Sequence, residues 1–329
     1  MTLDLLSIEP TKISRDLREK SITIFDAPKS GKTTVSSQFP KALLCATEVG
    51  YRALAGVNKV DIQKWTDFTK VLRQLDQPAV KEKFETIVID TVDILWSLAE
   101  KHVCNGAGVE KLSDVPFGAL YKTLADTLSE AIRSIPQKGY GVVFISHAVT
   151  KNFTDEEGQE YSKTVPTLND KSAGIILGAS DIIGYAKSIE KDGETKTALF
   201  LRKTPRFTAG SRFKYTPAVI EFKYESLVNA IADAIEKEAQ INAGAVTSEA
   251  HEIKEVVEKS FDEVKSEIDT IIANLMKDKT PEEQAKRAEG IKRIVESHLG
   301  KNKMLKDTTE DQRDHIELVL LDLQDLMVQ

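Results

Sequence analysis

Residues 26–34 read Asp-Ala-Pro-Lys-Ser-Gly-Lys-Thr-Thr and are the most specific indication of the fold in this sequence. It follows the apolar run Ile22–Phe25, which predicts a strand, and it precedes a predicted helix that begins near Gly31. A glycine-containing turn between a strand and a helix directs successive backbone N–H groups at one concave point, which suits a phosphate. The segment matches the phosphate-binding pattern Gly-x-x-x-x-Gly-Lys-Thr except at its first position.

This loop predicts ATP and Mg²⁺ as cofactors. Lys32 is expected to place its ammonium group against the β- and γ-phosphates, and Thr33 to supply a hydroxyl to Mg²⁺. Asp26 stands where glycine is usual, so we expect its carboxylate to point away from the phosphates. The residues expected to line the nucleotide are Ala27, Pro28, Lys29, Ser30, Gly31, Lys32, Thr33 and Thr34.

A second motif is the apolar strand Thr86–Asp90, which ends in an acid. Such a strand can place its carboxylate beside the Mg²⁺ of a bound nucleotide. Buried strands often end in Asp, so this pattern is weak alone. Its combination with residues 26–34 argues against an ordinary helix start that happens to carry Gly-Lys-Thr-Thr. We expect Thr33 and Asp90 to be the metal ligands.

Hydrolysis also needs a group that activates water. Thr91 follows Asp90, so the glutamate that many oligomeric ATPases carry at this position is absent. Glu48 lies at the end of the next predicted strand, Ala42–Ala46, and crevices of α/β sheets open at the carboxyl ends of strands. We expect Glu48 to be the general base, with a solvated loop acid as the alternative. Asp93 is a second candidate, either as a helix cap or as a water-mediated contact to the metal.

The pattern up to residue 240 predicts an α/β fold. Strand-like runs that are apolar on both faces alternate with amphipathic helices, which is typical of a mostly parallel sheet covered on both sides. Two later strands, Asp181–Glu190 and Thr195–Lys203, are expected to form an antiparallel hairpin extension with its turn at Lys191-Asp192-Gly193. A helix is expected over Phe117–Ile135, and an irregular surface loop over residues 147–166.

The charge divides the chain into two parts. Residues 240–329 carry 20 acidic and 13 basic side chains, so they account for the whole net charge of -7. We therefore predict an ATPase core over 1–240 and an acidic helical domain over 241–329. Three amphipathic segments in the second part predict a C-terminal α-helical bundle, with Thr280-Pro281 as a start signal and Gly300 as a stop. Its apolar stripe is expected to begin at Ile253, Val256 and Val257. Residues 242–248 are the expected linker.

Composition excludes several classes of protein. There is no apolar run long enough to cross a membrane and no signal-peptide pattern at the N-terminus, so we expect no membrane partner and a cytoplasmic location. The chain has two cysteines, Cys45 and Cys104, too few for a disulfide scaffold. His102, His251, His298 and His315 show no metal-binding spacing.

The chain resembles the phage RecA-like ATP-binding proteins of the Sak-four type, which are associated with single-strand annealing and recombination. The likeness rests on Asp26–Thr34, Thr47-Glu48-Val49-Gly50, Thr86–Asp93 and Ile145-Ser146-His147, and it covers about residues 15–225. It implies a RecA-like P-loop NTPase core, ATP with Mg²⁺, single-stranded DNA as partner and a homo-oligomeric ring or filament. If the chain is encoded by a phage, its location is the cytoplasm of the host cell.

The same resemblance gives His147 a role as a polar sensor of the γ-phosphate or the attacking water, although a lone His is also common at strand ends. The loop after it would then bind DNA, with Lys151, Phe153 and Lys163 as contacts, because aromatic stacking and lysine–phosphate pairing are typical of sequence-independent strand binding. The alternative is a solvated surface loop.

Between Lys196 and Ile220 the chain has six basic residues and no acid. These side chains could reach a neighbouring subunit's γ-phosphate, line a DNA groove, or form a solvated basic face. Their place at a predicted strand end favours Arg202, Lys203 and Arg206 for the first role. The six are Lys196, Arg202, Lys203, Arg206, Arg212 and Lys214.

The sequence thus predicts an ATPase that acts on single-stranded DNA in recombination, annealing or replication. Two alternatives stay open: a hexameric helicase-like motor or loader, and an ATP-gated binding or scaffold protein with little turnover. The acidic C-terminal helices are expected to bind a protein partner.

Overall fold

The computed structural model describes residues 10, 12–191, 194–242, 244, 246–247, 259–277 and 279–328. These residues fall into two compact units, one up to residue 247 and one from residue 259. The predicted turn at residues 192–193, the start of the predicted helical stripe (Ile253, Val256 and Val257), His251 and part of the expected linker lie outside the described residues. The division at residue 240 therefore stays a proposal.

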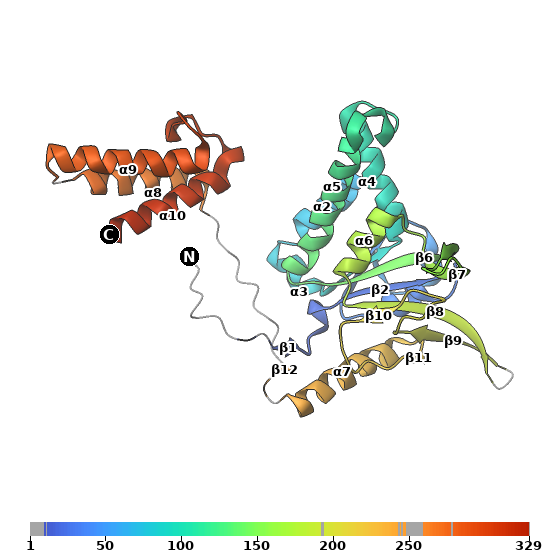
Figure 1. The fold of residues 1–329 in the computed structure, drawn as a ribbon. Coiled ribbons are helices and arrows are strands. Elements are labelled where there is room, and N and C mark those ends of the chain that lie inside the picture. Colours follow the sequence, from blue (N-terminus) through green and yellow to red (C-terminus); the bar gives the residue numbers. More distant parts are fainter. Residues whose placement is uncertain are drawn as a thin grey trace. The chain divides into compact units, whose positions relative to one another are not determined.

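The first unit is built on one large sheet with the strand order β11-β9-β8-β2-β6-β5-β3-β4 (Figure 1). From β8 to β4 all neighbouring strands are parallel. β9 pairs antiparallel with β8, β11 with β9, β10 with β8 and β7 with β6. The strands are β1 (Ile13–Ser14), β2 (Ser21–Asp26), β3 (Ala42–Ala46), β4 (Asn58–Asp61), β5 (Thr86–Asp90), β6 (Gly141–Thr154), β7 (Glu160–Pro166), β8 (Ile182–Lys191), β9 (Glu194–Phe200), β10 (Gly210–Ser211), β11 (Val219–Glu221) and β12 (Val246–Thr247).

Helices cover both faces of this sheet, with α2, α4, α5 and α6 on one side and α7 on the other (Figure 1). The helices are α1 (Lys32–Ser36), α2 (Trp65–Gln74), α3 (Pro78–Lys83), α4 (Val92–Ala107), α5 (Ala119–Gln137), α6 (Asp170–Ala179), α7 (Tyr224–Ile241), α8 (Phe261–Met276), α9 (Pro281–Leu299) and α10 (Arg313–Val328).

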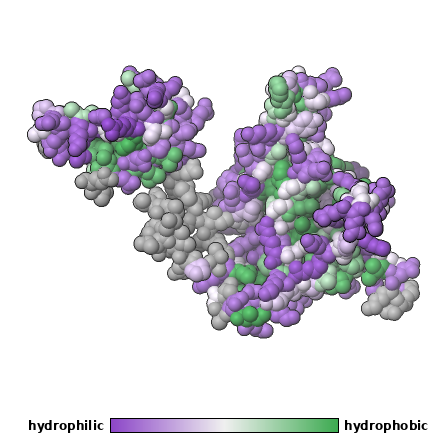
Figure 2. All heavy atoms as spheres, viewed as in Figure 1, coloured by the Kyte–Doolittle hydropathy of each residue, from purple (hydrophilic) through white to green (hydrophobic). Residues whose placement is uncertain are grey.

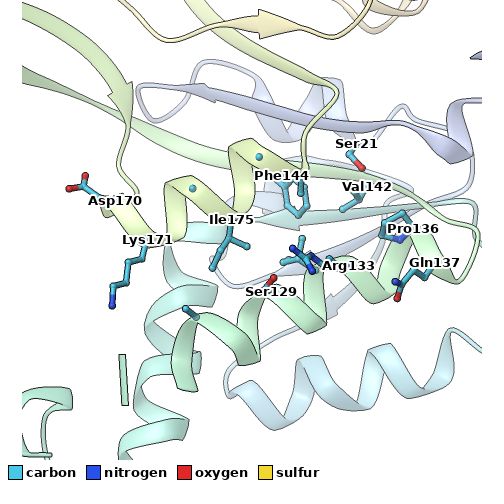
Figure 3. A pocket seen from close by; sticks show the side chains of 15 residues that line it. Ser21, Ser129, Arg133, Pro136, Gln137, Val142, Phe144, Asp170, Lys171 and Ile175 are labelled. Atoms are coloured by element: carbon cyan, nitrogen blue, oxygen red, sulfur yellow. The ribbon is translucent and has the colours of Figure 1, made fainter. Parts of the chain in front are cut away.

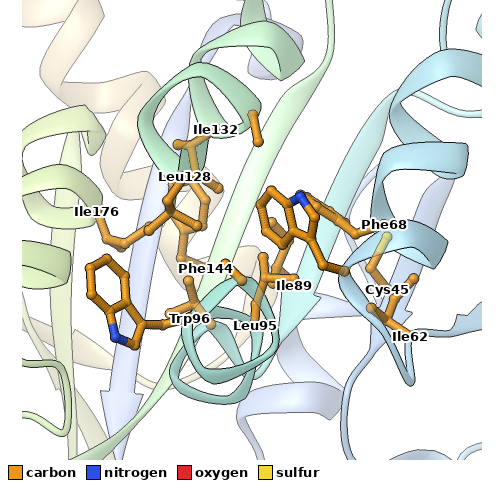
Figure 4. Close-up of a cluster of buried hydrophobic side chains, with 14 of the residues drawn as sticks. Cys45, Ile62, Phe68, Ile89, Leu95, Trp96, Leu128, Ile132, Phe144 and Ile176 are labelled. Carbon is orange, nitrogen blue, oxygen red and sulfur yellow. The ribbon is translucent and has the colours of Figure 1, made fainter. Parts of the chain in front are cut away.

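Each face of the sheet has its own hydrophobic core. In β5, Ile87 and Ile89 join the core under α2, α4 and α5, while Val88 between them joins the core on the other face. The first core is continuous from Cys45 to Ile176 (Figure 4). Because successive strand residues point to opposite faces, strands buried on both sides must be apolar throughout, which is why these strands were recognisable in the sequence.

The second unit contains α8, α9 and α10, which share one core. Thr280 and Glu283 form a reciprocal capping box at the start of α9, and Gly300 ends that helix, as predicted. The predicted fold class is therefore confirmed: an α/β core with a mostly parallel central sheet, an antiparallel extension and a C-terminal set of helices.

Two expectations about local structure were wrong. Residues 147–166 are not an irregular loop, because β6 continues to Thr154 and pairs with β7 in an antiparallel hairpin. The helix expected from Phe117 starts at Ala119 instead, and Phe117 has a left-handed backbone with φ 60°. Within the described ranges, no helix is both long and apolar enough to cross a membrane.

Candidate nucleotide-binding site

The loop between β2 and α1 is shaped by two residues with left-handed backbones. Lys29 has φ 66° and Gly31 has φ 88°. A residue with a Cβ is disfavoured in this region, which explains the glycine at the junction with α1. The turn brings the backbone N–H groups of the loop together, as a phosphate site requires.

Lys32 is folded back onto this loop. Its side chain is buried, with 5% exposed, and Nζ donates to the carbonyl oxygens of Asp26 at 3.0 Å and Ala27 at 2.7 Å. A weaker contact of 3.4 Å joins Nζ to Ser30 Oγ. Burial lowers the pKa of the Lys32 ammonium, and the nearby carboxylates, Asp26 first, oppose this effect. The ammonium therefore lies at the loop, and the atoms that accept its hydrogen bonds there are all neutral.

The two expected metal ligands touch each other. Thr33 Oγ1, on α1, donates to Asp90 Oδ2 at 2.7 Å, although β2, which leads into the loop before α1, is separated from β5 by β6. Burial raises the pKa of Asp90, and the charge of Glu48 adds to this effect. Hydroxyl and carboxylate oxygens are hard donors that suit Mg²⁺, which usually takes one or two protein ligands and completes its shell with waters and phosphates. In the described part of the chain no group of three or more His, Cys, Asp or Glu side chains is arranged to hold a metal.

Glu48 lies at the same edge of the sheet and is held by two other strands. Its Oε1 accepts a hydrogen bond from Thr91 Oγ1 at 3.1 Å and lies 3.1 Å from Nε2 of His147. The hydroxyl of Thr47 clamps the Asp90–Thr91 junction, accepting from Thr91 N at 2.7 Å and donating to Thr91 O at 3.0 Å. Glu48 and Thr91 follow the carboxyl ends of β3 and β5, and they meet His147 where β6 leaves the central sheet.

Asp93 anchors β6 and contacts neither Thr33 nor Lys32 through a hydrogen bond. Ser146 Oγ donates to its Oδ1 at 2.8 Å, and the backbone N–H of His147 donates to its Oδ2 at 3.2 Å. Burial raises the pKa of this carboxyl, and the bond from Ser146 opposes the rise. The sequence left two roles open for Asp93, a helix cap or a water-mediated contact to the metal. In the structure its carboxylate holds β6 at the point where this strand leaves the core.

A family model described as an AAA domain matches residues 18–213, which contain this entire arrangement. The chain belongs to the AAA domain family. The SPbeta prophage-derived uncharacterized protein YorG of Bacillus subtilis (strain 168) is 31% identical, and the match covers 100% of both chains.

Among solved structures, a KaiC-like protein of Pyrococcus horikoshii OT3 is 13% identical with a TM-score of 0.33, covering 57% of this chain and 80% of that one. The flagellar accessory protein FlaH of Methanocaldococcus jannaschii is 13% identical with a TM-score of 0.34, covering 63% and 85%.

In this AAA domain, the β6–β7 hairpin carries the side chains expected to contact DNA. Phe153 and Tyr161 face each other across the two strands and stack with ring centroids 5.8 Å apart. Lys163 Nζ lies 6.0 Å from the centre of the Phe153 ring, and Lys151 Nζ lies 4.0 Å from Asp170 Oδ1. Both rings are exposed. Tyr161 was missed by sequence analysis; Gly158, whose left-handed backbone turns the chain between the two strands, was the signal that could have indicated the hairpin.

The basic segment of the AAA domain, residues 196–220, contains basic side chains of two kinds. Some are bonded within their own chain, and others are exposed. The Arg202 guanidinium donates to the carbonyl oxygens of residues 211, 213, 214 and 216 of its own chain, so it fastens this segment. Arg212 pairs with Asp181 at 3.0 Å. Lys203 and Arg206 are exposed. Of the three residues expected to act across a subunit interface, Lys203 and Arg206 are therefore exposed, whereas Arg202 is bonded within its own chain.

The segment also contacts the hairpin. Thr164 N donates to the Arg206 carbonyl oxygen at 2.8 Å, and Thr208 N donates to the Thr164 carbonyl oxygen at 3.0 Å. The base of the hairpin is therefore tied to the basic segment through Thr164.

Replacing Asp90 by asparagine is expected to raise the Tm of the nucleotide-free protein. The raised pKa of Asp90, above its ordinary 3.8, means that the folded protein binds this proton more tightly than the unfolded chain. Stability is therefore lost as pH rises through the raised pKa. Asparagine does not titrate, so the Tm gain should be largest at neutral pH and shrink in acid. Thermal unfolding across this range measures it, and a gain independent of pH would contradict the assignment.

Proposed function

We propose that this protein is a Mg²⁺-dependent ATPase that binds single-stranded DNA through the β6–β7 hairpin and acts in phage recombination, annealing or replication as an assembly of several copies. One observation carries the proposal. β6 is a single strand that contacts Glu48 through His147 and then continues into the exposed hairpin. A change at the nucleotide site can therefore reach the hairpin along one strand.

Nucleotide binding is assigned to the loop, Lys32, Thr33 and Asp90. A phosphate would draw the Lys32 ammonium away from the carbonyl oxygens of Asp26 and Ala27, exchanging neutral acceptors for a charged one and so forming a stronger, charge-assisted bond. Thr33 and Asp90 would hold Mg²⁺, which supplies neutralisation of the charge that develops on the phosphates.

Water activation is assigned to Glu48. Thr91 and His147 engage Oε1, and among the described residues no hydrogen bond reaches Oε2. One carboxylate oxygen is thus oriented by the protein, and the other is available to take a proton from water. Asp93 acts indirectly, because it fixes the backbone of His147.

Single-strand binding is assigned to the exposed ring pair of the hairpin. Stacking of bases on aromatic side chains is sequence-tolerant, and lysines beside the rings can pair with phosphates. Phe153 and Tyr161 supply the rings, and Lys151 and Lys163 supply the charges. In this proposal ATP binding favours the assembled, DNA-bound form and hydrolysis releases it.

Two further parts of the proposal concern partners. Lys203 or Arg206 would complete the nucleotide site of a neighbouring copy by offsetting transition-state charge. The acidic second unit would bind another protein: Leu318 and Leu321 are exposed on α10, beside Asp314, Asp322 and Asp325. Exposed apolar side chains surrounded by acids suit a partner with basic residues around an apolar stripe.

Turnover of ATP with and without single-stranded DNA tests the proposal. We expect severalfold stimulation by DNA, and a loss of about 10²–10³ in turnover for Lys32→Ala, which removes a preorganised charge from the phosphates. Strand displacement in addition would favour a helicase-like motor. Nucleotide binding without measurable turnover would favour the ATP-gated scaffold and would sink the ATPase proposal.

A further inference from the structure

The tip of the helical hairpin formed by α4 and α5 carries a fully exposed aromatic side chain. Phe117 is 106% exposed, more than any other large hydrophobic residue described. The two helices stand off the sheet, and the tip lies at their far end (Figure 1). Figure 2 shows hydrophobic atoms gathered there. Burial of a whole phenyl ring would contribute favourable free energy, so the ring offers a contact to a partner surface.

The backbone at this tip holds the ring outward. Phe117 has φ 60° and ψ 15°, and Gly118 beside it has φ 68°. A bulky side chain at a left-handed position is unfavourable, and such positions persist where they serve a function. Pro116, directly before it, restricts the chain further. The backbone that carries the ring is thus set before binding, which lowers the entropic cost of inserting it.

A cavity lies along the second half of α5. It has a volume of about 770 Å³ and is open to solvent on one side, between α5, α6 and the sheet (Figure 3). Its floor is apolar, formed by Ile132, Val142, Phe144 and Ile175. Gly174 and Gly178 of α6 open its side, since a Cβ added at either would meet no atom within 4 Å. A cavity of this size accepts an aromatic side chain and part of the segment that carries it.

Phe117 cannot fill this cavity in its own chain. The ring precedes the first turn of α5, whereas Ser129 and Arg133, which line the cavity, lie about 18–24 Å further along the same helix at 1.5 Å per residue. The ring therefore cannot reach the cavity of its own chain, because the rigid helix α5 keeps the two apart. A second copy has no such limit.

We propose that Phe117 of one copy inserts into the cavity between α5 and α6 of the next copy. The inference deepens the assembly in the proposed function and rests on it. The charges around the cavity and around the tip are partly complementary. Arg133 and Lys171 line the cavity, and Glu110 and Asp114 are exposed at the tip. The cavity rim also contains Asp170, and the tip Lys111, so the ring supplies most of the affinity.

In this proposal the contact is head-to-tail: the tip of one copy enters the cavity of the next copy, and two copies do not exchange tips reciprocally. A heterologous contact of this kind joins copies into a ring if the rotation closes and into a filament if it does not. It also makes a strict prediction. A copy without the tip can still accept a neighbour, and a copy without the cavity can still donate to one.

The test uses two full-length variants whose assembly is followed by sedimentation velocity with Mg²⁺ and a non-hydrolysable ATP analogue. Phe117→Ser removes the tip. Gly174→Leu with Gly178→Leu fills the cavity, and leucine is favourable in a helix. The wild type should form species larger than a dimer, and each variant alone should be monomeric. A mixture of equal amounts should give dimers and nothing larger, because one working tip and one working cavity remain per pair.

Val219→Ser, which removes an exposed hydrophobic side chain elsewhere, is the matched control and should assemble like the wild type. Phe117→Gly suits the left-handed backbone, so it separates loss of the ring from misfolding. Assembly of either tip variant like the wild type would overturn the contact and leave the ATPase proposal standing. Monomers in the mixture would overturn it too, assigning the tip to DNA or another protein. A wild type that stays monomeric even with single-stranded DNA would overturn the assembly itself.

Discussion

Glu48→Gln should lower ATP turnover by about 10²–10⁴ and leave nucleotide binding intact, since this is the usual contribution of a positioned general base. Glutamine keeps an oxygen that can accept from Thr91 Oγ1, as Glu48 Oε1 does at 3.1 Å, so the local structure should survive. It cannot take a proton from water. Single-turnover measurements with the Mg²⁺ nucleotide, together with a separate binding titration, distinguish the two effects.

Glu190→Gln makes the same chemical change on an exposed side chain of β8 and should leave turnover unchanged. If Glu48→Gln retained DNA-stimulated hydrolysis at the wild-type rate, the base would have to be another group. Asp93 would not be an obvious replacement, because both of its carboxylate oxygens accept hydrogen bonds from β6.

Phe153→Ala with Tyr161→Ala should weaken single-stranded DNA binding by about 1–3 kcal/mol for each base that stacks on the pair. The two rings stack on each other 5.8 Å apart and are exposed, so their removal opens no core cavity. Basal turnover without DNA should be unchanged, and stimulation by DNA should be lost. Fluorescence anisotropy with a labelled oligonucleotide measures the affinity.

Salt dependence separates stacking from charge in the same experiment. The aromatic double variant should keep the wild-type slope of log affinity against log salt, whereas Lys163→Ala should reduce that slope because one phosphate contact is lost. Val219→Ala, on the edge strand β11, is the control for loss of an exposed apolar side chain. Wild-type affinity in the double variant would move the DNA site away from the hairpin, with the basic segment as the next candidate.

Much of the nucleotide site was visible in the sequence because its parts are local. The turn between β2 and α1 is specified by neighbouring residues, and Gly31 marks its left-handed position. The strand Thr86–Asp90 was recognised with its bounds intact because strands buried on both faces are apolar at every position. The roles predicted for Lys32 and Glu48 remain predictions.

Other features could not be recognised in the sequence, and the reasons for this are also physical. The hairpin of residues 147–166 projects beyond the core, so neither face of its outer part is buried and no apolar alternation marks it. The helix α6 was not expected at all, because its Gly174 and Gly178 weaken helix propensity and their role is spatial, at the wall of a cavity. Phe117 looked like the first residue of α5, and only its backbone shows otherwise.

The loop that suits a phosphate, the α/β class and the acidic helical second part could be predicted from the sequence, because each depends on neighbouring residues or on composition. Which distant residues meet depends on the tertiary structure. Thr33 reaches Asp90, and Glu48 reaches Thr91 and His147, because the strand order places the carboxyl ends of β2, β5 and β3 beside the part of β6 around His147. The physical reason is that strand order is set by the packing of the whole sheet, which no short stretch of sequence encodes.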